Sequence, residues 1–83
     1  MIPKTKHRPL STIARDIFRA WPNMYFGAVP YAREMALLDD INSPVMPSRC
    51  EDGRTMVLYF LANAKGWRGD TARAIKAELK GML

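Results

Sequence analysis

The sequence predicts a small all-α domain of four helices that ends in a helix-turn-helix-like hairpin. Apolar residues recur at helical spacing near the N-terminus, and a second amphipathic segment follows a proline. The last third joins an apolar stretch to a basic amphipathic stretch through residues 66–70. Because 83 residues with 48% apolar content can build one small core, we divide the chain into a flexible basic arm (residues 1–9) and one helical domain (residues 10–83).

The first helix is expected to begin at Leu10. Its apolar residues form one continuous stripe: Leu10, Ile13, Ala14, Ile17, Phe18 and Trp21. Ser11 or Thr12 is expected to cap its start, because a side-chain oxygen there accepts a hydrogen bond from an unpaired backbone N–H. Pro22 ends the helix. The opposite face is expected to be solvated and carries Arg15, Asp16 and Arg19.

The second helix is expected to begin at Pro30, since the first turn of a helix does not need the missing N–H. Its inner face and its small contact residues are Tyr31, Met35, Leu38 and Ile41, with Ala32 and Ala36. Residues 42–44 end it. In the connection before it, we expect the rings of Tyr25 and Phe26 to fold back onto the core. Residues 43–51, with two prolines and no apolar pattern, are expected to form a loop.

The third helix is expected at residues 53–65, with Asp52 as its N-cap. Residues 56–61 leave almost no polar face, so this helix should be central and covered on most sides. A buried strand is the competing interpretation of this apolar run. We favour a helix because residues 62–64 extend it without β-forming residues and Gly66 is a typical left-handed terminator.

The fourth helix is expected to be capped by Asp70, whose charge also suits the positive end of a helix. The residues expected to face inward are Ala72, Ile75, Leu79 and Met82. Those expected to face outward are Arg73, Lys76, Ala77 and Lys80. One side of this helix is therefore available to a partner.

No pattern in the sequence points to catalysis. His7 lies in the arm and lacks the fixed orientation that a general base needs. Cys50 stands beside two acids, which disfavours a reactive thiolate. Asp39 and Asp40 would project about 100° apart from a helix, so they do not converge on one metal ion. We expect a protein that is not an enzyme and that has no catalytic residues, cofactor, metal or small-molecule substrate.

The cysteine and histidine counts indicate the cytoplasm, because one Cys and one His can form neither a disulfide nor a zinc site. No apolar run reaches the length of a membrane span, and the N-terminus lacks the apolar stretch of an export signal. We expect no membrane contact. A chain this short often gains stability from a second copy, so a homodimer stays open.

The net charge of +5 is concentrated in two segments. Residues 4–8 carry three positive charges and no negative one, and residues 65–80 carry five against two acids. Residues 31–42 are locally acidic. This asymmetry can steer a polyanion or an acidic protein surface toward one side, although a solvated basic face explains it equally well.

The first binding hypothesis is that the C-terminal hairpin engages nucleic acid or the acidic surface of a protein that handles nucleic acid. Ala62 stands four residues before Gly66, as in a helix-turn-helix, where a small residue lets the helices approach. Lys65 departs from the pattern, and an ordinary helical hairpin gives much of the same spacing. The residues expected to contact the anionic partner are Lys65, Arg68, Arg73, Lys76 and Lys80.

The second hypothesis is a stoichiometric protein inhibitor that binds through exposed aromatic rings. Its candidates are Trp67, Tyr25 and Phe26, because a core this small can leave some rings outside and aromatic residues are common interface anchors. Trp67 lies just past a helix end beside Arg68, which makes it the best candidate for exposure.

One further pattern consists of residues 59–64, Trp67-Arg68-Gly69, residues 71–73 and residues 75–79, with Pro30-Tyr31 and Met35. In this pattern the chain, from about Leu10 to Leu83, resembles a family of small uncharacterised proteins of bacteriophages, plasmids and other mobile elements. The resemblance implies no activity and no catalytic residues. It implies a setting in which tiny proteins occupy host proteins or DNA, including anti-defence inhibition of the anti-CRISPR kind.

Overall fold

The computed structural model describes residues 8–46 and 51–83, and within them it confirms the all-α class with four helices. The helices are α1 (Leu10–Ala20), α2 (Val29–Met35), α3 (Gly53–Ala62) and α4 (Asp70–Met82). Two short strands, β1 (Pro44–Met46) and β2 (Glu51–Asp52), are added to them. No helix in the described residues is both long enough and apolar enough to cross a membrane.

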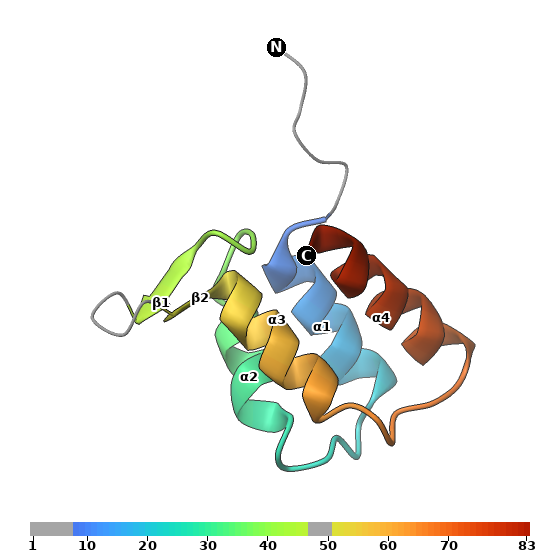
Figure 1. The fold of residues 1–83 in the computed structure, drawn as a ribbon. Coiled ribbons are helices and arrows are strands. Elements are labelled where there is room, and N and C mark those ends of the chain that lie inside the picture. The colour runs from blue at the N-terminus through green and yellow to red at the C-terminus, as the bar shows by residue number, and fades with distance from the viewer. Residues whose placement is uncertain (1–7, 47–50) are drawn as a thin grey trace.

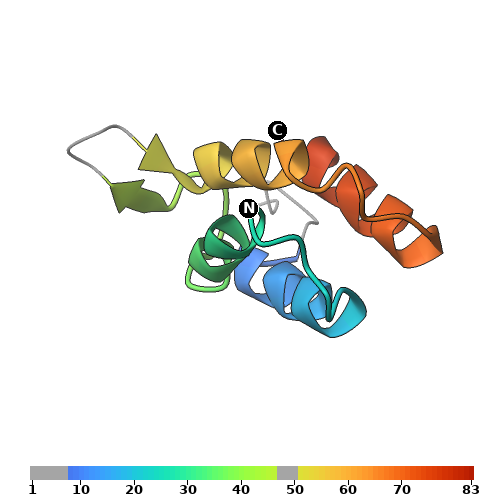
Figure 2. The same ribbon diagram turned by 90° about the horizontal axis from the view of Figure 1, so that it is seen from below.

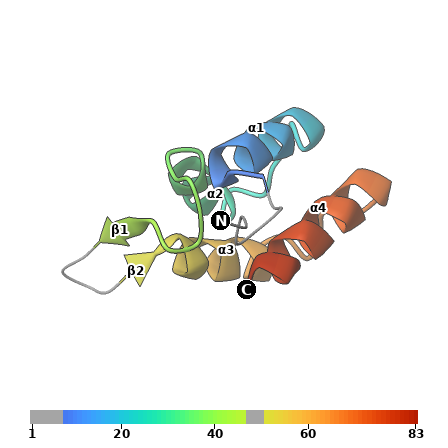
Figure 3. The same ribbon diagram turned by 90° about the horizontal axis from the view of Figure 1, so that it is seen from above.

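The elements form two layers (Figures 2 and 3). One layer contains α1 and α2, and the other contains the β-ribbon, α3 and α4. In the view of Figure 1, α1 is seen between α3 and α4, and α2 is seen next to α3, although α1 and α2 belong to the other layer. Arg54 at the start of α3 donates a hydrogen bond of 2.9 Å to the carbonyl of Leu83, so the beginning of α3 meets the end of α4.

The core lies between the layers and confirms most members of the predicted stripes. Phe18, which was placed in the first stripe, is instead 38% exposed, and Trp21 is only partly buried. The fully or nearly fully buried members of the core include Leu10, Ile13, Ala14 and Ile17 of α1, Ala32 and Met35 of α2, Met56, Val57 and Phe60 of α3, and Ala72, Ile75 and Leu79 of α4. Each buried large side chain of this kind contributes about 1.5–3 kcal/mol by leaving water. All four helices therefore depend on one shared apolar interior.

The start of α1 is capped by distant backbone instead of by Ser11 or Thr12, so the predicted cap is wrong. Pro9 occupies the N-cap position and makes no side-chain cap bond. The N–H groups of Leu10 and Ser11 donate to the carbonyls of Asp39 and Leu38, both at 2.9 Å. Because tertiary contacts already satisfy these N–H groups, the helix does not need a hydroxyl cap.

The second helix ends at Met35, well before the predicted stop at residues 42–44. After it, the N–H groups of Leu37 and Leu38 donate to the carbonyls of Glu34 and Met35, three residues back, so the chain leaves the α-helix through a tighter turn. Leu38 still reaches the core from the following turn. Asp39 and Asp40 consequently lie in a turn and not on a helix surface, and their N–H groups donate to the Ser43 hydroxyl.

Residues 43–51 are not simply a loop, because β1 and β2 pair in antiparallel fashion with an irregular register. Their connection, which includes Cys50, lies outside the described residues. Gly53 follows β2 at a close backbone crossing, where its N–H donates to Ser43 O at 2.9 Å. A Cβ at this glycine would lie 2.9 Å from Ile41 Cα and even closer to Asp40 O, so no larger residue fits.

The cap of α3 is confirmed, whereas its far end differs from the prediction. The carboxylate of Asp52 accepts a hydrogen bond of 3.2 Å from the N–H of Thr55. The helix ends at Ala62, and Gly66 does not have a positive φ. The helix is also less covered than expected, because Leu58 and Tyr59 are about half exposed.

The left-handed glycine is Gly69 (φ 111°), which is the N-cap of α4. The prediction that Asp70 caps α4 is therefore wrong, because Asp70 is the first helical residue and makes no cap bond. Its charge still lies in the first turn, where the helix dipole favours an acid. The predicted inner face of α4 is confirmed, with Met82 packed partly buried against the core.

Candidate nucleic-acid interface

Trp67 is a core residue and not an exposed anchor, which corrects the sequence prediction. Only 5% of it is exposed. Its ring stacks on Trp21 with centroids 5.1 Å apart and an interplanar angle of 3°, and it meets Phe60 edge-on at 6.4 Å. This three-ring cluster joins the connection between α3 and α4 to the end of α1. The start of α4 is therefore fixed in position.

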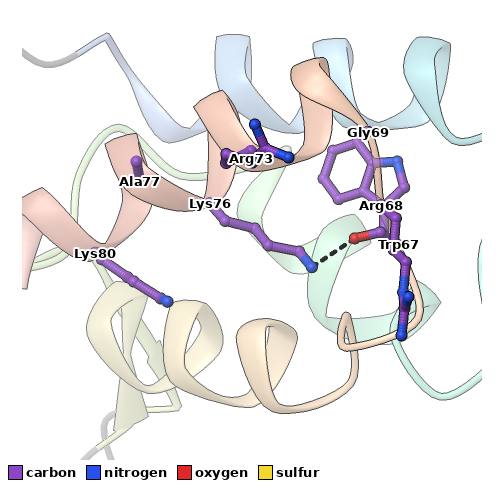
Figure 4. A pocket seen from close by; sticks show the side chains of 7 residues that line it. All are labelled: Trp67, Arg68, Gly69, Arg73, Lys76, Ala77 and Lys80. Carbon is purple, nitrogen blue, oxygen red and sulfur yellow. Dashed lines mark hydrogen bonds between the residues drawn. The ribbon is translucent and has the colours of Figure 1, made fainter.

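A second contact holds this connection against α4. The Lys76 Nζ donates a hydrogen bond of 2.6 Å to the carbonyl of Trp67 (Figure 4). The expectation that Lys76 faces freely outward is therefore wrong, since its head lies against the turn and is partly buried. Arg73 and Lys80 on the same helix are exposed as predicted.

A groove of about 380 Å³ runs along this side of α4. It is lined by four cationic side chains, those of Arg68, Arg73, Lys76 and Lys80, together with Trp67, Gly69 and Ala77 (Figure 4). None of these described lining residues is acidic. The structure thus brings together four of the five cations that the sequence singled out.

The cations in the groove repel one another. Partial burial lowers the pKa of Lys76, and the positive charges of Lys80 and Arg68 lower it further. A basic group whose pKa is lowered in the fold destabilises the folded protein as long as the group is protonated. This loss of stability is present at neutral pH and is relieved as the pH rises through the lowered pKa. A bound anion would relieve the same repulsion without deprotonation.

Among the four cations of the groove, Arg73 lies close to an acidic side chain, that of Asp70. Its Nη1 lies 3.6 Å from the Asp70 carboxylate, one helical turn away, and both side chains are largely exposed to water. Exposed pairs of this kind are weak and easily exchanged for another anion. Asp70 therefore leaves Arg73 available to a stronger partner.

Lys65 is separated from the other four cations. It lines a second hollow, of about 580 Å³, which adjoins the same connection. This hollow is also lined by Tyr25, Trp21, Asn23 and Asn63, with Ala62 and Gly66. Lys65 was the one cation of the five that departed from the helix-turn-helix pattern, but its separation from the others depends on the path of an irregular connection and could not be read from spacing.

Tyr25 and Phe26 lie on the surface, and the prediction that they fold onto the core is wrong. They are 50% and 80% exposed, and their ring centroids are 4.9 Å apart. Gly27 allows this arrangement, because the Tyr25 ring lies over it. A Cβ at Gly27 would come within 2.6 Å of Tyr25 Cε2. The exposure of these two rings fits their role as candidate binding residues.

The predicted hairpin of α3 and α4 is present, with a connection at residues 63–69. This connection is longer than the three or four residues typical of a DNA-reading helix-turn-helix. Helix α4 also packs along its length more extensively against α1 than against α3. The basic side of α4 therefore lines a groove together with the connection that precedes this helix.

Arg8 is held in place although the sequence assigned it to the flexible arm. It donates two hydrogen bonds to the Glu78 carboxylate, at 3.0 and 2.8 Å, and a third to Asp16. These bonds raise the pKa of Arg8 and lower that of Asp16. Asp16 is thus part of an ion-pair network that joins α1 to α4. The rest of the predicted arm, including His7, lies outside the described residues.

No family model, curated protein or solved structure matches this chain. The resemblance to proteins of mobile elements therefore stays a prediction. Within residues 8–46 and 51–83, no group of three or more His, Cys, Asp or Glu side chains is placed to hold a metal ion.

Proposed function

We propose that this protein is a non-enzymatic, cytoplasmic binder of nucleic acid that holds the phosphate backbone in the groove beside α4. One observation carries the proposal: four cations line a groove that has no acidic side chain among its described lining residues. Partial burial lowers the pKa of Lys76, and repulsion from Lys80 and Arg68 lowers it further, which is the direction expected where positive charges lack a compensating anion. Phosphate oxygens supply the missing negative charge.

The groove also supports binding because its frame is rigid before any ligand arrives. The Trp21–Trp67 stack fixes the turn, and the bond from Lys76 to the Trp67 carbonyl fixes the turn against α4. A preformed site loses little side-chain entropy on binding. Arg68 and Lys80 at the rim need only reorient their ends toward a phosphate.

The test compares two variants that each lose two positive charges. In Arg73→Gln/Lys80→Gln the charges are lost from the groove, and in Arg15→Gln/Arg33→Gln they are lost from exposed positions outside it. Binding to a fluorescein-labelled oligonucleotide is followed by anisotropy across a salt series. We expect the groove variant to bind roughly tenfold or more weakly, and its slope of log K against log[salt] to fall by about 1.4 to 1.8.

The control variant should keep the wild-type salt slope to within about 0.5, because it retains the phosphate contacts. Equal losses in both variants would mean that only net charge attracts the oligonucleotide, which would contradict a site at the groove. Absence of binding by the wild-type protein at low salt would dismiss the proposal altogether.

A second candidate function is stoichiometric inhibition of a partner protein, in the anti-defence sense that the resemblance implies. The observation in its favour is that Leu58 and Tyr59 are about half exposed on α3. The ring of Tyr59 also packs against that of Tyr31, with ring centroids 5.2 Å apart. Trp67 no longer supports it, because it is buried. An apolar interface should survive nuclease and about 0.5 M salt and be lost in Leu58→Glu, whereas groove binding should show the opposite pattern.

The same apolar pair could instead meet its counterpart in a second copy of the chain, as a homodimer. Sedimentation of the wild-type protein and of Leu58→Glu decides between these uses of the surface. A dimer that the substitution dissociates assigns the pair to self-association.

A further inference from the structure

The second hollow has a different chemical character from the basic groove. Its described lining contains two aromatic rings, two carboxamides and one ammonium group, from Trp21, Tyr25, Asn23, Asn63 and Lys65. Phosphate binding alone would not use rings or carboxamides. Flat rings accept stacked bases, and carboxamides can donate to and accept from base edges.

The two hollows are lined by consecutive parts of a single connection. Gly66 lines the second hollow and its neighbour Trp67 lines the groove, and consecutive Cα atoms lie only about 3.8 Å apart. Apart from its two chain neighbours, no residue lies within 4 Å of the point where a Cβ of Gly66 would be. Gly66 therefore places no side chain between the two hollows, and an extended ligand that follows the turn past this residue can reach from one to the other.

The aromatic groups beside the second hollow are exposed in the way that a stacking platform requires. Tyr25 lines it with half of its surface exposed, and its ring contacts the still more exposed ring of Phe26. The amide of Asn63 is oriented by its bond of 2.9 Å to the Tyr59 carbonyl, and its Oδ1 lies against Gly27, only 2.8 Å from the point where a Cβ of that residue would be.

A duplex keeps its bases stacked inside and presents mainly phosphate to a basic groove. A single strand exposes both phosphates and bases, which matches a cationic groove that continues into an aromatic and amide-lined hollow. We infer that the nucleic acid is single-stranded, with phosphates along Arg68, Arg73 and Lys80 and an unpaired base against Tyr25 and Phe26. This inference rests on the proposed function, and it names the ligand of that site.

The experiment measures anisotropy with three labelled probes, namely a 15-mer of dT, a 15-mer of U and a blunt 15-base-pair DNA duplex. Both single strands should bind the wild-type protein at least tenfold more tightly than the duplex. Tyr25→Ala/Phe26→Ala should weaken single-strand binding by about 5- to 150-fold, since stacking contributes about 1–3 kcal/mol per base. Its duplex affinity and salt slope should stay unchanged. Preference for one of the two single strands would identify DNA or RNA as the ligand.

The matched control is Leu37→Ala, which removes an apolar side chain that is 79% exposed and that lines neither hollow. It should bind all three probes as the wild type does. A duplex that binds as tightly as the single strands, or equal weakening of all probes by Tyr25→Ala/Phe26→Ala, overturns the single-strand inference. The groove proposal survives that result if Arg73→Gln/Lys80→Gln still weakens binding. Absence of binding to every probe overturns both.

Discussion

At the scale of single residues, the sequence left the places of the aromatic side chains open. Trp67, the best candidate for exposure, is buried, while Tyr25 and Phe26, which were expected either to fold onto the core or to anchor a partner, are exposed. Local sequence could not distinguish these outcomes, because the partner that buries Trp67 is Trp21, far away along the chain. The available signal was Trp21 itself, a large apolar ring at the very end of the first stripe that needs a cover.

The burial of Trp67 predicts a stability effect. Trp67→Ala should lower the free energy of unfolding by about 3–5 kcal/mol, because it removes the stacked ring and leaves a cavity between Trp21 and Phe60. Domains of this size have about 5–15 kcal/mol in total, so the variant should be near its limit of stability. Urea denaturation followed by circular dichroism measures the change.

Leu37→Ala is the comparison for this measurement, because its exposed side chain should change the unfolding free energy by less than about 0.5 kcal/mol. Equal stability of Trp67→Ala and the wild type would contradict the stacked cluster. A loss of binding in Trp67→Ala, in contrast, would say nothing about an aromatic interface, since it would follow from loss of the fold.

At the scale of elements, the bodies of the helices could be predicted and their ends could not. The stripes of α1 and α4 identify their buried faces because helical periodicity is a local property of the chain. The ends depend on distant backbone, as in the bonds from Leu10 and Ser11 to the segment after α2. The β-ribbon was missed because strands of three and two residues are too short to show an alternating pattern.

The candidate site follows the same division. The cations of α4 could be assigned to one side from their spacing, and Arg68 joins them in the groove. The bond from Lys76 to the Trp67 carbonyl could not be foreseen, because it depends on the path of an irregular connection. The second hollow also combines residues 21–25, which follow α1, with residues 62–66 at the end of α3 and the start of the next connection, and no local pattern encodes their proximity.

At the scale of the whole molecule, Arg8 connects parts of the chain that are far apart in sequence. It bonds to Asp16 on α1 and to Glu78 on α4, and these helices carry opposite sides of the core. The same network keeps α4, and with it the basic groove, in a fixed position relative to α1. The positive charge of Arg8 is thereby used for the fold and is not part of the binding surface.

This network predicts a pH-dependent stability. The hydrogen bond from Arg8 lowers the pKa of Asp16, and the charges of Arg19 and Arg15 act in the same direction. A carboxyl whose pKa is lowered in the fold contributes stability that is complete above its unfolded value of about 4 and is lost as the pH falls through the lowered value. Arg8→Gln should therefore melt a few degrees below the wild type at pH 7, and the difference should shrink below about pH 4.

Thermal unfolding from pH 2.5 to pH 7 measures this difference, with Arg33→Gln as a control that removes an exposed positive charge outside the network. Arg33→Gln should track the wild type at every pH, because no ion pair with Asp16 is lost. A gap between Arg8→Gln and the wild type that stays constant down to pH 2.5 would show that Arg8 acts through packing of its side-chain stem. In that case the ion pairs of Arg8 with Asp16 and Glu78 would contribute little to the connection between α1 and α4, because protonation of the two carboxylates would not change the effect of the substitution.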